Sequence, residues 1–173
     1  MSRCIDVWFF GVEWEWEWQV RHEDQAGPLS PRQRWLGILA RADLRELQEA
    51  WVRHAGDITY RFLRRPEIGM VMVRGRAGGN GQPFNLGEMT VTRCAVQLDN
   101  AEIVGFGYVG GRDARRAELV AAFDALLQAE THSAALQSHV IEPLAKDQRR
   151  RRETAARKTA QTRVEFFTMV RGG

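Results

Sequence analysis

The sequence predicts an α+β protein with two N-terminal helices, a four-stranded antiparallel sheet, and C-terminal helices that include a long polar helix. Apolar residues recur at helical spacing before Gly56 and again after Arg112. Between Asp57 and Val109, β-branched and aromatic residues interrupted by glycine dominate instead. The chain has 173 residues, of which 44% are hydrophobic and 27% charged, so we expect one globular domain with a short extension.

Two short helices are expected at about 31–41 and 44–54. Ser30 and Gln33 have the spacing of a capping box at the start of the first helix, with a proline at the first helical position. Asp43, followed three residues later by a glutamate, predicts a cap for the second helix. The apolar stripe of this pair consists of Trp35, Leu36, Leu39, Leu44, Leu47 and Trp51.

Four segments are predicted to be strands: ITYRFLRR, EIGMVMVRGR, GEMTVTRCAVQL and IVGFGYV. Pro66 separates the first two, because proline cannot donate a hydrogen bond to a neighbouring strand. The connections between the segments are too short for helical crossovers, so the sheet should be antiparallel.

Helices are expected to return after Asp113, which can cap the first of them. A second helix begins near Thr131, and Pro143 should interrupt and kink it. From Ala145 to about Arg163 the pattern is helical but almost entirely polar, so this helix spans solvent or lies on a partner. The apolar face of the first of these helices contains Leu119, Val120, Phe123, Leu126 and Leu127.

Residues 1–27 differ in composition from residues 30–173, which we expect to form the domain, with a C-terminal arm at 145–173. The stretch EWEWEWQV alternates strictly, so that a strand would place three tryptophans on one face and three glutamates on the other. We interpret residues 1–27 as a variable or disordered extension, or as the product of a start codon placed too early. An added edge strand or an adhesive patch is the alternative.

Positive charge gathers near the end of the sequence, although the net charge is only +3. From Pro143 onward there are nine Lys or Arg residues and three Asp or Glu residues. A basic face can meet nucleic acid, nucleotide phosphates or an acidic protein surface. No aromatic residue lies between Lys146 and Arg163, so the RRRR stretch at 149–152 favours a solvated or protein-docking helix over a nucleic-acid-binding one.

Two cysteines far apart form no disulfide framework, and no apolar run approaches the roughly 20 residues of a membrane helix. We therefore expect a cytoplasmic protein. The sequence offers no metal site, since none of the four histidines has ligand spacing with another, and no catalytic residue. Cys94 is expected to be a buried structural thiol, because no adjacent base would activate it.

RAGGNGQPFNLGE is the most unusual internal stretch. Gly78, Gly79 and Gly81 could expose backbone N–H groups to a phosphate, but glycine clusters more often connect strands, so we favour a hairpin connection. Arg76 precedes the stretch and Arg93 follows it. Arg93 shares a largely apolar strand face, so it should have an anionic partner.

A second candidate for anion binding is GYVGGRDARR, in which a strand ends in two glycines and Arg112 opens a helix. Helix N-termini attract anions, and this arginine would reinforce the attraction. We favour a tight strand-to-helix turn, because Asp113 already supplies a negative charge there.

The last ten residues are unusually apolar for a chain end. Burial of two phenylalanines and a methionine is worth roughly 5–8 kcal/mol by area, before the cost of ordering the chain. We expect this segment to be an anchor that is buried in a partner subunit. The expected interface residues are Arg163, Val164, Phe166, Phe167, Met169 and Arg171.

Four stretches in order, GGNGQPFNLGEMTVTRCAVQL, GFGYVGGRDARRAELVAAFDALLQ, VIEPLAKDQ and TRVEFFTMVRG, resemble the PhnG family of subunits of bacterial carbon–phosphorus lyase. The resemblance runs from about Pro31 to Gly173, and TVTRCAV and FFTMVRG are its most specific parts. Residues 1–27 fall outside it.

The resemblance implies a component of the carbon–phosphorus lyase core, in which G-, H-, I- and J-type subunits assemble in two copies each and ATPase-like K- and L-type subunits associate. The G-, H- and I-type subunits, with the L-type subunit, transfer the ribose triphosphate of ATP to a phosphonate and release adenine. The nucleosidase-like chemistry is attributed to the I-type subunit and the later radical chemistry to the J-type subunit.

No established catalytic residue belongs to the PhnG family, so the resemblance implies an accessory role in which this chain binds no cofactor and ATP is a substrate of the complex. Two alternatives remain. In one, the chain binds ATP or the phosphonate directly through its arginines. In the other, the chain is a basic nucleic-acid-binding protein.

Overall fold

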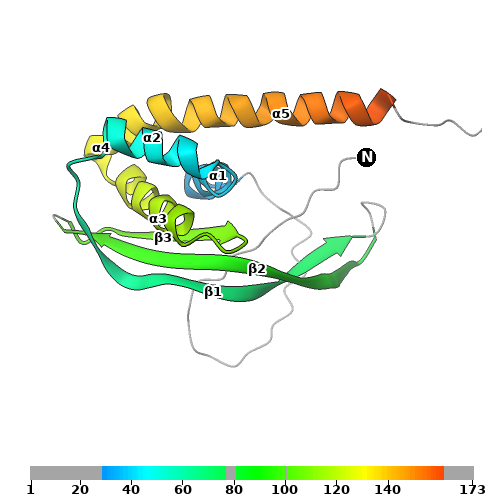
Figure 1. Cartoon of the computed structure of the whole chain (residues 1–173), viewed down its shortest axis with the longest axis horizontal. Helices are drawn as coiled ribbons and strands as arrows, with labels where there is room; N and C mark the ends of the chain where they lie inside the picture. The colour runs from blue at the N-terminus through cyan, green and yellow to red at the C-terminus, as the bar shows by residue number, and fades with distance from the viewer. Residues whose placement is uncertain (1–28, 77–80, 100, 162–173) are drawn as a thin grey trace, which may run out of the picture.

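Five α-helices, one π-helical turn and a three-stranded antiparallel sheet make up the part of the chain that the computed structural model describes, residues 29–76, 81–99 and 101–161 (Figure 1). In chain order they are α1 (Pro31–Leu39), α2 (Leu44–His54), β1 (Tyr60–Arg76), β2 (Pro83–Leu98), β3 (Val104–Gly110), α3 (Ala114–Gln128), α4 (Glu130–Leu136), the π-helical turn η1 (Gln137–Ile141) and α5 (Glu142–Gln161). None of the described helices is long and apolar enough to cross a membrane.

The sheet has three strands in the order β1-β2-β3, and the prediction of four strands is wrong. Pro66 does not separate two strands. The ladder between β1 and β2 shifts register on both sides of Arg64, and pairing resumes at Glu67, so the proline lies in a bulge. Because β1 is an edge strand, a residue without an N–H group can remain inside it. The antiparallel pairing is as predicted.

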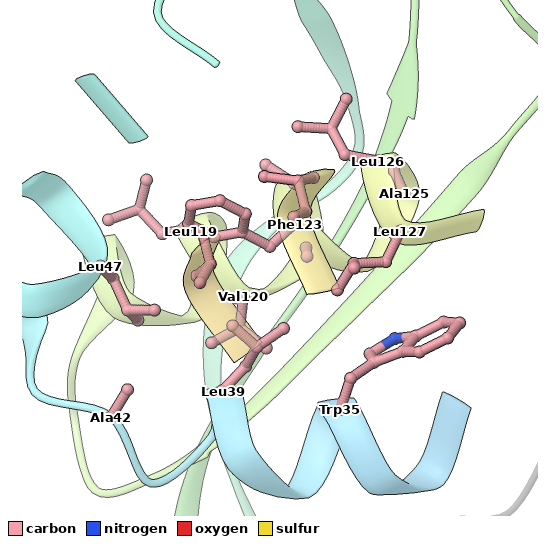
Figure 2. Close-up of a cluster of buried hydrophobic side chains, with 14 of the residues drawn as sticks. Trp35, Leu39, Ala42, Leu47, Leu119, Val120, Phe123, Ala125, Leu126 and Leu127 are labelled. Atoms are coloured by element: carbon pink, nitrogen blue, oxygen red, sulfur yellow. The ribbon is translucent and has the colours of Figure 1, made fainter. Parts of the chain in front are cut away.

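Helix α3 is the centre of the domain. It lies on the sheet, and α1 and α2 lie on its far side, so that it is buried from both directions (Figure 1). The sequence pattern predicted one apolar face, but ten of its fifteen residues are buried. A helix that is apolar on most sides belongs between two layers. Figure 2 shows its side chains meeting those of α1 and α2, and the labelled residues are Trp35, Leu39, Ala42, Leu47, Leu119, Val120, Phe123, Ala125, Leu126 and Leu127.

Two glycines of β3 allow α3 to approach the sheet closely. A Cβ atom on Gly105 would lie 2.0 Å from the carbonyl oxygen of Ala121, and one on Gly107 would lie 2.0 Å from that of Ala117. No side chain fits at such a distance, so glycine at both positions sets the spacing between helix and strand.

The predicted helix starts are confirmed. The Ser30 hydroxyl accepts a hydrogen bond from the Gln33 N–H group, and the Gln33 side chain accepts one from the Ser30 N–H group. Glu46 accepts from the N–H group of Asp43 at the start of α2, and Asp113 accepts from the N–H group of Arg116 at the start of α3. The sequence therefore specified these three boundaries through local hydrogen bonds.

Pro143 lies in the first turn of α5, directly after the π-helical turn. The N–H group of Glu142 bonds to the carbonyl of Gln137, five residues earlier. Proline has no N–H group and its ring crowds the carbonyl four residues before it, so a wider turn relieves the conflict. The predicted interruption is therefore a change of helix type, and helical structure continues through it.

Beyond the helical layers, two elements project toward the same side in the view of Figure 1. One is α5, the long polar helix that the sequence predicted. The other is a two-stranded ribbon that consists of residues 70–76 of β1 and residues 83–90 of β2. β3 pairs with β2 only from Val91 onward, so the ribbon extends past the third strand.

Candidate functional site

Arg93 has an anionic partner, as its position on an apolar strand face led us to predict, but this partner is a residue of the same chain. Arg93 pairs with Glu67 of β1 across the ladder, and its Nε atom lies 2.5 Å from Glu67 Oε1. Arg64 contacts the same carboxylate oxygen at 3.1 Å. The three side chains form a partly exposed charge cluster on the face of the sheet opposite to the helices. Contact of Arg93 with a phosphate stays a prediction.

The glycine-rich stretch connects β1 to β2 as a hairpin, as we favoured. Gly78 and Gly79 lie outside the described residues. Arg76 is the last residue of β1, and its Nη1 atom donates to the carbonyl of Gly81 at 3.4 Å. This end of the hairpin is also the far end of the ribbon.

The three candidate arginines are spread over the domain. Arg76 pairs with Pro83, ten positions before Arg93 in β2, which corresponds to roughly 33 Å along a strand. Arg112 follows β3 and is exposed at the start of α3. Because Arg76 is so far from Arg93 along the sheet, the three arginines do not form one phosphate-binding cluster within this chain.

The strand-to-helix turn before α3 is closed by the protein's own groups. The Thr92 hydroxyl is fully buried, donates to the carbonyl of Gly111 at 2.7 Å and accepts from the N–H group of Asp113 at 3.0 Å. Gly111 has φ +88°, which favours glycine. Asp113 caps the helix, so the favoured interpretation of a tight turn is confirmed.

The arginine run of α5 is partly used to hold this helix on the domain. Arg151 contacts Asp43 and Glu46 at the start of α2, as well as Asp147 within its own helix. Gln148 donates to the carbonyl of Ile38 at 2.8 Å. Part of the run is therefore engaged within the domain, and docking of this helix on another protein stays a prediction.

Asp124 is the polar residue that sequence reasoning missed. Its carboxylate is fully buried within α3, and it ties α1, α3 and β3 together. Arg32 donates to both oxygens, at 3.1 and 2.7 Å, and the Trp35 indole and the Phe106 N–H group each donate at 2.9 Å. The sequence did contain a signal for this network, namely a single acidic residue inside the apolar run LVAAFDALL. A carboxylate buried in such a run needs hydrogen-bond or charge partners.

The remaining reactive side chains do not assemble a catalytic set within the described residues. Burial raises the pKa of the Cys94 thiol to about 12, with a smaller contribution from the charge of Glu118. This thiol is therefore protonated and structural, as predicted. His54 and His139 stack with ring centroids 5.6 Å apart, a contact that spacing did not reveal. In the same part of the chain, no group of three or more His, Cys, Asp or Glu side chains could hold a metal ion.

The expected C-terminal interface lies outside the described residues, from Arg163 to Arg171. Residues 1–27, the predicted extension, lie outside them too. Both expectations stay predictions.

Comparison with known proteins identifies the family. Residues 30–172 match the model of the family described as phosphonate metabolism protein PhnG. The chain is also 47% identical over 157 residues to alpha-D-ribose 1-methylphosphonate 5-triphosphate synthase subunit PhnG of Rhizobium meliloti (strain 1021). This alignment covers 88% of the chain and 96% of the relative. The family match over residues 30–172 and the identity to this relative show that the chain belongs to the PhnG family.

Proposed function

We propose that this chain is a component of alpha-D-ribose 1-methylphosphonate 5-triphosphate synthase and that it acts in assembly, without supplying a catalytic group. The observation that carries the proposal is the 47% identity to a synthase component across 96% of that relative. The accessory role is supported by the thiol of Cys94, which is buried and protonated, and by the guanidinium of Arg93, which already pairs with Glu67 of the same chain. The reaction transfers the ribose triphosphate of ATP to a phosphonate and releases adenine.

The partners in this proposal are the H-, I- and J-type subunits of the carbon–phosphorus lyase core, two copies of each, with K- and L-type subunits associated, in the cytoplasm. We infer that the arm beyond residue 145 holds the chain in this complex through Phe166, Phe167 and Met169. Aromatic and methionine side chains are typical interface anchors. Deletion of residues 164–173 should then release the chain from its partners.

Co-expression tests the proposal directly. The tagged full chain is produced with the H-, I- and J-type subunits, purified by affinity and examined by mass analysis. We expect a stable complex, and we expect adenine release from ATP and methylphosphonate, with the L-type subunit added, only when this chain is present. Equal release without the chain would contradict the proposal. Full co-purification of the chain that lacks residues 164–173 would contradict only the anchor.

Direct ligand contact is a second candidate, and exposed Arg112 favours it most. Within the described part of the chain, no hydrogen bond or ion pair engages this guanidinium. Arg112→Ala, Arg93→Ala and Arg76→Ala in the co-expressed complex separate the two roles. An accessory chain keeps adenine release within about twofold when these arginines are lost, whereas a complex that assembles fully but loses activity by about tenfold or more would assign ligand contact to that arginine.

A further inference from the structure

A row of large apolar side chains on β1 begins beside β3 and continues onto the ribbon. Ile68, Met70 and Met72 alternate along β1 on the face that continues the helix-covered side of the sheet. Their exposed fractions are 59%, 67% and 51%. On β2, Leu86 at the bulge is exposed, and so is Phe84, which pairs with Gly75 and lies on the other face of the ribbon. Apolar side chains gathered on one projecting element are typical of an interaction surface.

Both edges of the ribbon are open within the described part of the chain. β1 has no neighbour on its outer side, and β2 has lost β3 as a neighbour before Val91. An isolated two-stranded ribbon is marginally stable in water, and an exposed apolar edge promotes aggregation unless something covers it. This ribbon lacks the helix that covers the other half of the same strands.

Charge identifies the kind of surface that fits. β1 carries five arginines and one glutamate, and that glutamate, Glu67, already contacts Arg64 and Arg93. By alternation, the row that begins at Ile68 ends in Arg74 and Arg76. A second copy of the chain would bring two arginine-rich edges together, which is unfavourable.

We propose that the ribbon docks against another subunit of the synthase, on an apolar strip whose far end carries carboxylates. This inference rests on the proposed function and adds a second attachment point, separate from the arm. The apolar row supplies the apolar surface area that is buried in the contact, and the flexible methionine side chains can adapt to an irregular surface. The two terminal arginines pair with the carboxylates and set the direction in which the ribbon lies.

Methionine oxidation measures the burial of this surface in the unaltered protein. The purified complex is treated with hydrogen peroxide, and the oxidation of Met70 and Met72 is followed by mass analysis, with the complex in urea as the unprotected reference. We expect oxidation in the native complex to be at least about tenfold slower than in urea. The isolated chain, treated in the same way, should react nearly as fast as in urea because both side chains are exposed.

Charge insertion tests whether the contact matters for assembly. The double variant Met70→Lys/Met72→Lys is co-expressed with the partner subunits, and Val52→Lys is the matched control. Val52 is 76% exposed on α2, away from the ribbon, so a lysine there should change nothing. We expect the double variant to recover at most about a tenth of the partner protein that the wild type and Val52→Lys recover. Far-ultraviolet circular dichroism checks that both variants are folded.

The outcomes separate this inference from the proposed function. A wild-type chain that captures no partner subunit contradicts the proposed function. A wild-type complex in which Met70 and Met72 oxidise at the urea rate contradicts the ribbon contact alone. Protection in an isolated monomer would mean that the chain's own segments cover the ribbon. Protection in an isolated dimer, detected by light scattering, would mean that a second copy does, and either result overturns the proposal.

Discussion

The two halves of the β1–β2 pair share the alternation of side chains between two faces, but their environments are opposite. In the half next to β3, Cys94 and Val96 are 2% and 0% exposed because α3 covers them. In the ribbon, Met70 and Met72 on the same face of the sheet are 67% and 51% exposed. Alternation decides which face a side chain takes, but a neighbouring element decides whether that face is buried.

The difference between the halves indicates which half stabilises the folded chain and which half is available for assembly with partners. The covered half packs against α3, which carries the buried carboxylate of Asp124, and pairs with β3, whose glycines contact α3, so changes there should alter the free energy of unfolding. The ribbon has few contacts to lose, so changes there should alter partner binding and leave the folded chain nearly as stable. Four predictions test this division.

The largest effect is expected from Asp124→Asn. Four close donors converge on the carboxylate, and an amide would place N–H groups against some of them. Loss of a buried charge partner costs about 3–5 kcal/mol. Urea denaturation should show this decrease, whereas the exposed control Asp99→Asn should unfold like the wild type. A decrease below about 1 kcal/mol would mean that the network does not hold α1 on the domain.

The same glycine-to-alanine change should have opposite consequences in the two halves. Gly107→Ala would place a Cβ atom 2.0 Å from a backbone carbonyl of α3, so we expect a loss of about 3 kcal/mol. Around Gly75 in the ribbon, no atom beyond the glycine and its two neighbours in the chain lies within 4 Å of an added Cβ atom. Alanine there should be neutral or stabilise by up to about 1 kcal/mol. Equal unfolding midpoints for the two variants would contradict the comparison.

High pH should lower the free energy of unfolding through two groups in the covered half. Burial raises the pKa of Cys94 to about 12, and burial together with a hydrogen bond to Glu118 raises that of Tyr60 to about 12. The ordinary values are 9.0 and 10.0. The folded state therefore keeps protons that the unfolded state loses, so stability is full below about pH 9 and decreases as pH rises toward 12. Urea midpoints measured across this range should fall less steeply in Cys94→Ala than in the wild type.

The smallest effect is expected from Met70→Thr. Its side chain is mostly exposed, so the free energy of unfolding of the isolated chain should change by less than about 0.5 kcal/mol. Val96→Thr is the matched change in the covered half, where burial of a hydroxyl should cost about 1–3 kcal/mol. If Met70→Thr destabilised the chain as much as Val96→Thr, the ribbon would be packed within the chain itself.

Local signals in the sequence predicted much of the fold and little of its arrangement. The caps at Ser30, Asp43 and Asp113 were readable because each depends on residues three positions apart. Pro66 misled the strand count, since a bulge in an edge strand tolerates a proline that a central strand would not. Asp124 was missed because its partners lie 18 to 92 residues away in the chain.

The sequence by itself determined the α+β order, the helix starts, the polar character of α5 and the membership in a family. Each of these depends on periodicity, short-range hydrogen bonds or motif order, which neighbouring residues carry. Only the tertiary structure decided that α3 is buried on both sides, that Glu67 neutralises Arg93, and that the ribbon half of the β1–β2 pair has no cover within the described part of the chain. These three features depend on which distant elements come into contact, and a single sequence has no periodic pattern that reports such contacts.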